Sequence, residues 1–123
     1  MDTFVRDPFG RDLSIAAGAS RTDPQHVGPR EFGSVRVPST WPADTDLVFE
    51  TCDTKSGTYV LACDENGAAH RIKNILPGVS RAYSVPEGAM RRSLPFVRLV
   101  AVAAGSVADA LLAADQTVHL SIR

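Results

Sequence analysis

Apolar and polar positions alternate in short runs from Glu31 to the C-terminus, and this pattern predicts half-buried β-strands. The first clear run is Phe32-Gly-Ser-Val-Arg-Val37, which Pro38 ends. Further strand-like runs cover residues 13–16 (the weakest), 47–52, 58–63, 69–75, 80–85, 96–102 and 117–122. About eight short strands at this spacing are typical of a β-sandwich. We therefore expect an all-β fold, a single antiparallel, jelly-roll-like β-sandwich.

Two turns set the sheet face that we expect to be buried. Asn66-Gly67 is typical of a two-residue type I′ turn, which would place Cys63 opposite His70. A preceding turn centred on Lys55 would place Phe49 opposite Leu61. Because both registers put the same residues on one face, we expect a core face of Leu47, Phe49, Tyr59, Leu61, Cys63 and Ile72. The closing strand is expected to add Val118, Leu120 and Ile122.

Two segments depart from this pattern. Prolines and glycines interrupt the first 30 residues, so we expect residues 1–30 to form an extended N-terminal arm and linker. Residues 31–123 are expected to form the β-sandwich domain. Residues 106–115 are rich in alanine, and Ser106 followed by Asp109 imitates a helix-capping box. We expect a loop with one or two helical turns there.

Composition bounds the classes of function. A chain of 123 residues suits one domain, and a net charge of −1 excludes a nucleic-acid binder that relies on bulk charge. The longest apolar stretch, around residues 97–104, is too short to span a bilayer and contains Arg98. The charged N-terminus lacks the apolar region of a secretory signal. We expect no nucleic-acid partner, no membrane partner, and synthesis in the cytoplasm.

Reactive side chains form no recognisable catalytic or metal-binding pattern. Cys52 and Cys63 would lie far apart on opposite faces of the expected hairpin, so we expect free thiols. Cys63 opposite His70 would suit an activated thiolate, but no third group that would orient the histidine is identifiable. A structural cysteine is the preferred interpretation. The histidines lack metal-ligand spacing. We expect no metal, no cofactor and no enzymatic activity.

Charge is distributed unevenly along the chain. Residues 71–98 carry +5 (six basic residues against Glu87), whereas residues 1–60 carry −3 (nine acidic residues against six basic). Arginine is favoured at interfaces because its planar guanidinium group binds carboxylates bidentately. Two interpretations stay open: a basic edge that docks on an acidic neighbour, such as another copy of the chain, or a solvated surface.

Trp41 lies in an expected loop between Pro38 and Pro42. An exposed indole there would suit a sugar-stacking platform, whereas a buried one would plug the end of the sandwich. We favour the plug, since the chain has few other aromatic residues to complete a platform.

Residues 34–123 resemble a recurrent small β-sandwich protein of the structural gene clusters of tailed phages and prophages. The segments that carry the resemblance are Val35-Arg-Val-Pro-Ser-Thr-Trp41, Asp46-Leu-Val-Phe-Glu50, Tyr59 to Asp64 with Gly67, Phe96-Val-Arg-Leu99 and Asp115-Gln-Thr-Val-His-Leu120. The family pattern does not account for residues 1–30, and residues 103–114 replace a short polar loop that is usual in the family.

The resemblance implies a non-enzymatic structural protein of the virion. It would be a capsid decoration protein, or the base of a head spike or fibre, on a phage head or a phage-like gene transfer agent. Its partners would be capsid, spike or fibre proteins and further copies of itself in a homo-oligomer, with a host surface glycan as a further ligand. The expected interface residues are Phe4, Phe9, Arg11, Trp41, Arg91 and Arg92. The alternative is a carbohydrate-binding or adhesion module, which would expose Trp41 or Tyr83.

Overall fold

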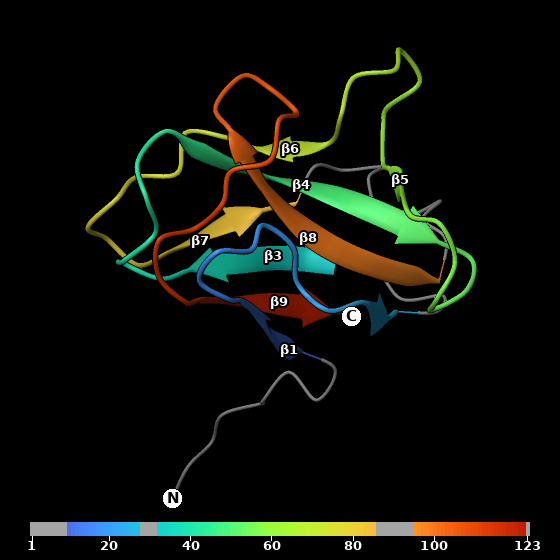
Figure 1. Ribbon diagram of the computed structural model, residues 1–123, viewed down its shortest axis with the longest axis horizontal. Coiled ribbons are helices and arrows are strands. Elements are labelled where there is room, and N and C mark those ends of the chain that lie inside the picture. Colours follow the sequence, from blue (N-terminus) through green and yellow to red (C-terminus); the bar gives the residue numbers. More distant parts are fainter. Residues whose placement is uncertain (1–9, 28–31, 86–94, 123) are drawn as a thin grey trace, which may run out of the picture.

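The computed structural model describes residues 10–27, 32–85 and 95–122. The strands are β1 Arg11–Ile15, β2 Gln25–His26, β3 Phe32–Val37, β4 Thr45–Cys52, β5 Val60–Leu61, β6 Arg71–Ile72, β7 Arg81–Ser84, β8 Phe96–Ala103 and β9 Gln116–Ile122. One sheet, here the β9 sheet, has the order β1-β9-β3-β7 (Figure 1). The other, here the β4 sheet, has the order β2-β8-β4-β5, with β6 also on β4. No helix occurs in these ranges, so the expected all-β sandwich is confirmed.

Strand pairing is nested along the chain. β1 pairs with β9, β2 with β8 and β3 with β7, while β4 pairs with both β5 and β6. Every one of these pairs is antiparallel. The chain therefore resembles one long hairpin that is rolled up, and β1 to β4 alternate between the two sheets.

One apolar core fills the space between the sheets. Its largest fully buried side chains are Trp41, Phe49, Ile15, Leu47, Leu99 and Leu120. Five of the nine residues expected in the core belong to it, namely Leu47, Phe49, Ile72, Val118 and Leu120. The side chain of Ile122 lies outside the described part of the structure. The other three, Tyr59, Leu61 and Cys63, do not lie in this core. The register of β5 on β4 explains those three errors, because Leu61 pairs with Glu50 instead of Phe49.

The turn at Asn66-Gly67 is also one residue out of the expected register. Of these two residues only Gly67 has a positive φ, 80°, and Asp64 Oδ1 accepts hydrogen bonds from the amides of Asn66 (2.8 Å) and Ala68 (3.0 Å). The loop therefore holds one more residue than a type I′ turn, and Cys63 pairs with Ala69 instead of His70. β6 then joins β4 rather than β5. A shift of one residue sends alternate side chains to the opposite face.

The described part of the expected N-terminal arm is integrated into the sheets. Residues 10–27 contain β1 and β2, and Leu13, Ile15 and Val27 lie in the core. Residues 1–9, and the expected boundary at residues 30 and 31, lie outside the described residues.

The alanine-rich segment 106–115 is a loop, as expected, but the helical turns predicted there are absent. The Ala103 amide donates to the carbonyl oxygen of Ala108 (3.0 Å), and the Ala110 amide donates to that of Ala101 (2.9 Å). Pairing with β8 therefore satisfies the backbone and overrides the helix propensity of alanine.

Candidate docking site

The outer face of the β4 sheet is covered by the protein itself. Val48, Val100 and Val102 form a second apolar cluster on this face, against Leu61 and Ala69. Residues 20–22 run along β8, where the Thr22 amide donates to the carbonyl oxygen of Leu99 (3.0 Å). These residues extend the sheet beside β8, and the side chains of Leu61 and Ala69 cover the apolar cluster on its outer face.

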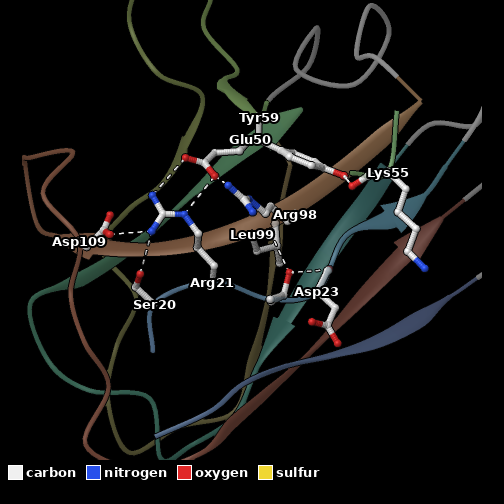
Figure 2. A network of polar contacts seen from close by, with 10 residues as sticks. Ser20, Arg21, Asp23, Glu50, Lys55, Tyr59, Arg98, Leu99 and Asp109 are labelled. Atoms are coloured by element: carbon white, nitrogen blue, oxygen red, sulfur yellow. Dashed lines mark hydrogen bonds and ion pairs between the residues drawn. The ribbon is translucent and has the colours of Figure 1, made fainter. Parts of the chain in front are cut away.

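Four charged side chains connect these segments to the sheet (Figure 2). We call Arg21, Glu50, Arg98 and Asp109 the arginine network. Arg98 Nε donates to Glu50 Oε1 at 2.7 Å, and the two residues are direct partners across β4 and β8. Arg21 Nε donates to the same oxygen at 3.2 Å, and Arg21 Nη1 donates to Asp109 Oδ2 at 2.6 Å. The network therefore joins β4 and β8 to the β1–β2 and β8–β9 connections.

Hydrogen bonds and burial raise the pKa values of two groups in and beside the network, Arg21 and Tyr59. Hydrogen bonds to Glu50 and Asp109 raise the pKa of Arg21 above its ordinary value. The guanidinium carbon of Arg98 lies 4.3 Å from the ring centroid of Tyr59. Burial raises the pKa of the Tyr59 phenol, which donates a hydrogen bond to the carbonyl oxygen of Lys55 at 2.9 Å. Because the charges are matched inside the chain, we interpret the network as structural.

A pocket of about 770 Å³, here the end pocket, opens where β4 begins. β6 pairs with β4 only through Ile72 and Arg71, after which the two segments separate and form opposite walls of the pocket. An ion pair lies in its lining, because Arg71 Nη1 donates to Asp46 Oδ2 at 2.8 Å. The Asp46 side chain is only 6% exposed, and Arg71 Nη2 also donates to the carbonyl oxygen of Ser106 at 2.5 Å.

The end pocket combines an apolar wall with a charged rim. Ile75 and Leu76 line the wall, and Leu76 is 48% exposed. Lys73 and Asp44 are exposed on the rim, and within the described ranges neither side chain has a hydrogen bond or an ion pair. Asp44 and Asn74 adopt φ values of 54° and 59°, which these residue types tolerate, and the bends direct the chain around the pocket.

The outer face of the β9 sheet is open and polar. Asp12 Oδ1 lies 2.8 Å from His119 Nδ1, and the hydroxyl groups of Ser14 and Thr117 are 3.0 Å apart. With Arg36 of β3, three of these residues border a shallow pocket of about 150 Å³. Short polar side chains therefore leave this sheet accessible to another molecule.

Two of the six expected interface residues are described. Trp41 is 1% exposed, and its indole nitrogen donates to the carbonyl oxygen of Thr45 at 2.9 Å. The buried indole agrees with the favoured interpretation of Trp41 as a plug, and its interpretation as an exposed sugar-stacking platform is wrong. Arg11 is exposed on the edge strand β1, where Nη1 donates to the carbonyl oxygen of Gly10 at 3.0 Å. The remaining four, Phe4, Phe9, Arg91 and Arg92, lie outside the described residues.

Tyr83, the other aromatic residue considered for a sugar platform, is half-buried. Its hydroxyl oxygen accepts a hydrogen bond from the Leu76 amide at 3.0 Å. The side chain therefore supports the loop that forms the wall of the end pocket.

The basic segment 71–98 is partly neutralised inside the molecule. Arg71 and Arg98 form ion pairs with Asp46 and Glu50, so these two arginines are not part of a free basic edge. Sequence reasoning missed both pairs, since their partners are 25 and 48 residues away in the chain. The only available signal was the two acidic residues of the β4 run, Asp46 and Glu50, whose spacing of four places them on the same face of a strand.

Cys52 is buried, Cys63 is exposed, and both thiols are free, as expected. Within residues 10–27, 32–85 and 95–122, no group of three or more histidine, cysteine, aspartate or glutamate side chains is placed to hold a metal ion. The same residues contain no helix with the length and apolar character to cross a membrane. Comparisons with protein-family models, curated proteins and solved structures found no match.

Proposed function

We propose that this chain is a non-enzymatic structural protein of a phage or phage-like particle. It attaches to the head as a decoration protein or as the base of a head spike or fibre. The observation that carries the proposal is the nested strand pairing, from β1 with β9 inward to β4 with β5 and β6. We interpret this order as a jelly roll in which β5 and β6 share one strand position. Jelly rolls recur in viral capsid domains.

Jelly rolls also occur in lectins and cupins, so the fold alone does not select the virion. The resemblance of residues 34–123 to phage structural proteins supports that choice. We do not propose a carbohydrate-binding module, because its expected platform residue, Trp41, is buried.

The distribution of covered and open surfaces supports a docking role. The arginine network and the Asp46–Arg71 pair satisfy these charged side chains within the β4 sheet and the segments beside it. The open face of the β9 sheet and the end pocket are then the surfaces available to partners. On a particle each contact is repeated at every symmetry-related position, so weak contacts add up to stable attachment.

The proposal is tested by adding the purified full-length chain to particles from producing cells that lack its gene. We expect saturable binding when the particles are pelleted, with a number of copies per particle that fits the symmetry of the head. A β-sandwich protein of similar size and charge serves as the control. Pelleting at the level of that control would contradict the proposal.

A further inference from the structure

We propose that the end pocket of one copy receives residues 1–9 of a second copy. The inference deepens the proposed docking function and rests on it, because it names the neighbour that occupies the pocket. Residues 1–9 lie outside the described structure, and both their sequence and the position of residue 10, where the described chain begins, support this assignment.

The pocket offers an apolar wall between two unpaired opposite charges. Leu76, at 48% exposure, is one of the most exposed large apolar side chains of the described residues, and it lies beside the buried Ile75. Lys73 and Asp44 supply one positive and one negative charge on the rim. A complementary ligand therefore carries apolar side chains flanked by charges of both signs.

The N-terminal segment has this composition. Its sequence is Met-Asp-Thr-Phe-Val-Arg-Asp-Pro-Phe, in which Phe4 and Val5 are flanked by Asp2 on one side and Arg6 on the other. Phe4 and Val5 would cover the apolar wall. Arg6 would bind Asp44, and Asp2 would bind Lys73. Burial of one phenylalanine side chain contributes more free energy than a tenfold change in affinity requires.

The register of the β9 sheet places the start of β1 at the end of the sandwich away from the pocket. Arg11 pairs with Leu120 near the end of β9, whereas Ile15 pairs with Gln116 at its beginning. The end of β9 lies beside the start of β3, since Phe32 pairs with Ile122. The residues that line the pocket follow the other end of β3, and Figure 1 shows the β3–β4 and β6–β7 connections together on the left.

The length of residues 1–9 favours binding in the pocket of a neighbouring copy over binding in the pocket of the same copy. Nine extended residues reach at most roughly 30 Å. To enter its own pocket, the segment would first return along β1, about 17 Å for five residues, and then cross from one sheet to the other, about 10 Å. Little length would remain to enter the pocket. A second copy placed head to tail would present its pocket directly to the segment. Repetition of this contact forms a closed ring when the rotation between successive copies allows it.

The test measures self-association of the full-length chain by sedimentation velocity over a range of concentrations. Phe4→Ser changes the segment, and Leu76→Lys changes the pocket at a position whose exposure preserves folding. Each variant is expected to weaken self-association about tenfold or more. Val79→Lys is the matched control, because Val79 is 45% exposed on the same connection but does not line the pocket. It should associate like the wild type.

Mixing the two variants provides the decisive result. A Phe4→Ser copy keeps an intact pocket and a Leu76→Lys copy keeps an intact segment, so the mixture should form dimers that neither variant forms alone. A chain that is monomeric at all concentrations overturns the proposal. Unchanged association of Leu76→Lys, equal weakening by Val79→Lys, or a mixture that stays monomeric overturns it as well.

Failure of this inference can be told from failure of the proposed function. A monomeric chain that still binds particles overturns only the exchange of residues 1–9. A chain that associates through segment and pocket but does not pellet with particles overturns only the role in the virion.

Discussion

The two sheets of this sandwich share one core but differ on their outer faces. β4 is buried along nearly its whole length on both faces, whereas β1 alternates between exposed and buried positions. Val48 and Val100 point away from the core of the β4 sheet and are still about 1% exposed. At corresponding outward positions the β9 sheet carries Asp12 and Thr117, which are exposed.

The difference comes from the segments beside the β4 sheet and the side chains over it. Residues 20–22 and the β8–β9 loop extend the sheet beside β8, and side chains such as Leu61 and Arg21 lie over the outer face of the β4 sheet. The described ranges contain no second apolar cluster on the outer face of the β9 sheet. An antiparallel sheet usually buries one face and exposes the other. The β4 sheet departs from this rule because side chains of the protein cover it, whereas the described outer face of the β9 sheet and the end pocket stay accessible.

We expect the largest change in the free energy of unfolding when a charge is introduced at an outward position of the β4 sheet, and a much smaller change at an outward position of the β9 sheet. Val100→Asp places an unpaired charge in the covered cluster and should lower the free energy of unfolding by more than about 4 kcal/mol. The milder Val100→Ala should lose about 2 kcal/mol and stay folded. Thr117→Asp on the open face should lose less than about 1 kcal/mol in urea unfolding. Equal losses for Val100→Asp and Thr117→Asp would remove the distinction between the faces.

The next effect concerns the ion pair in the end pocket. Asp46→Ala leaves Arg71 half-buried without its carboxylate, so we expect a loss of about 3–5 kcal/mol in urea unfolding. The control is Asp44→Asn, two residues earlier on the exposed rim, because asparagine removes the charge but tolerates the positive φ of this position; it should lose less than about 0.5 kcal/mol. A loss below 1 kcal/mol for Asp46→Ala would mean that water already screens this pair.

A smaller effect is expected in the arginine network. Glu50→Gln keeps the shape of the side chain, which is 14% exposed, but removes the charge that two arginines share. We expect a loss of about 1–3 kcal/mol, reduced by the partial exposure of Arg21. Asp109→Asn, at the exposed end of the network, should lose less than about 1 kcal/mol. Thermal unfolding checks both variants, and a larger loss for Asp109→Asn would reverse our ranking of the two carboxylates.

The smallest effect is expected on the open face. Asp12 is 72% exposed, so Asp12→Ala should change the free energy of unfolding by at most about 1 kcal/mol although it removes the contact with His119. Chemical denaturation at low and high salt measures this change. A loss above 2 kcal/mol, or one that salt does not reduce, would show that the β9 sheet depends on this pair.

The sequence was most informative where one face of a strand is buried and the other is exposed. The run Phe32–Val37 was predicted with the bounds that β3 has, because its alternation reflects a half-buried strand. The short run at residues 13–16 was recognised as a strand, yet it was assigned to an arm, since pairing of β1 with the distant β9 leaves no local signal.

Contacts between distant segments could not be predicted. The expected core face was wrong at Tyr59, Leu61 and Cys63 because β5 pairs with β4 one residue out of the expected register, with Leu61 opposite Glu50. The end pocket is formed by residues 43–46 and 71–77, whose separation follows from the short pairing of β6 with β4. No local pattern in the sequence specifies where two paired strands stop pairing.

The proposed role as a structural protein of the particle head is tested by fractionating a producing lysate on a density gradient. Mass spectrometry then follows this chain and the major capsid protein through the same fractions. We expect that both peak together and that the chain stays in this peak when the particles are banded a second time. Recovery of the chain only among free proteins at the top of the gradient would contradict it.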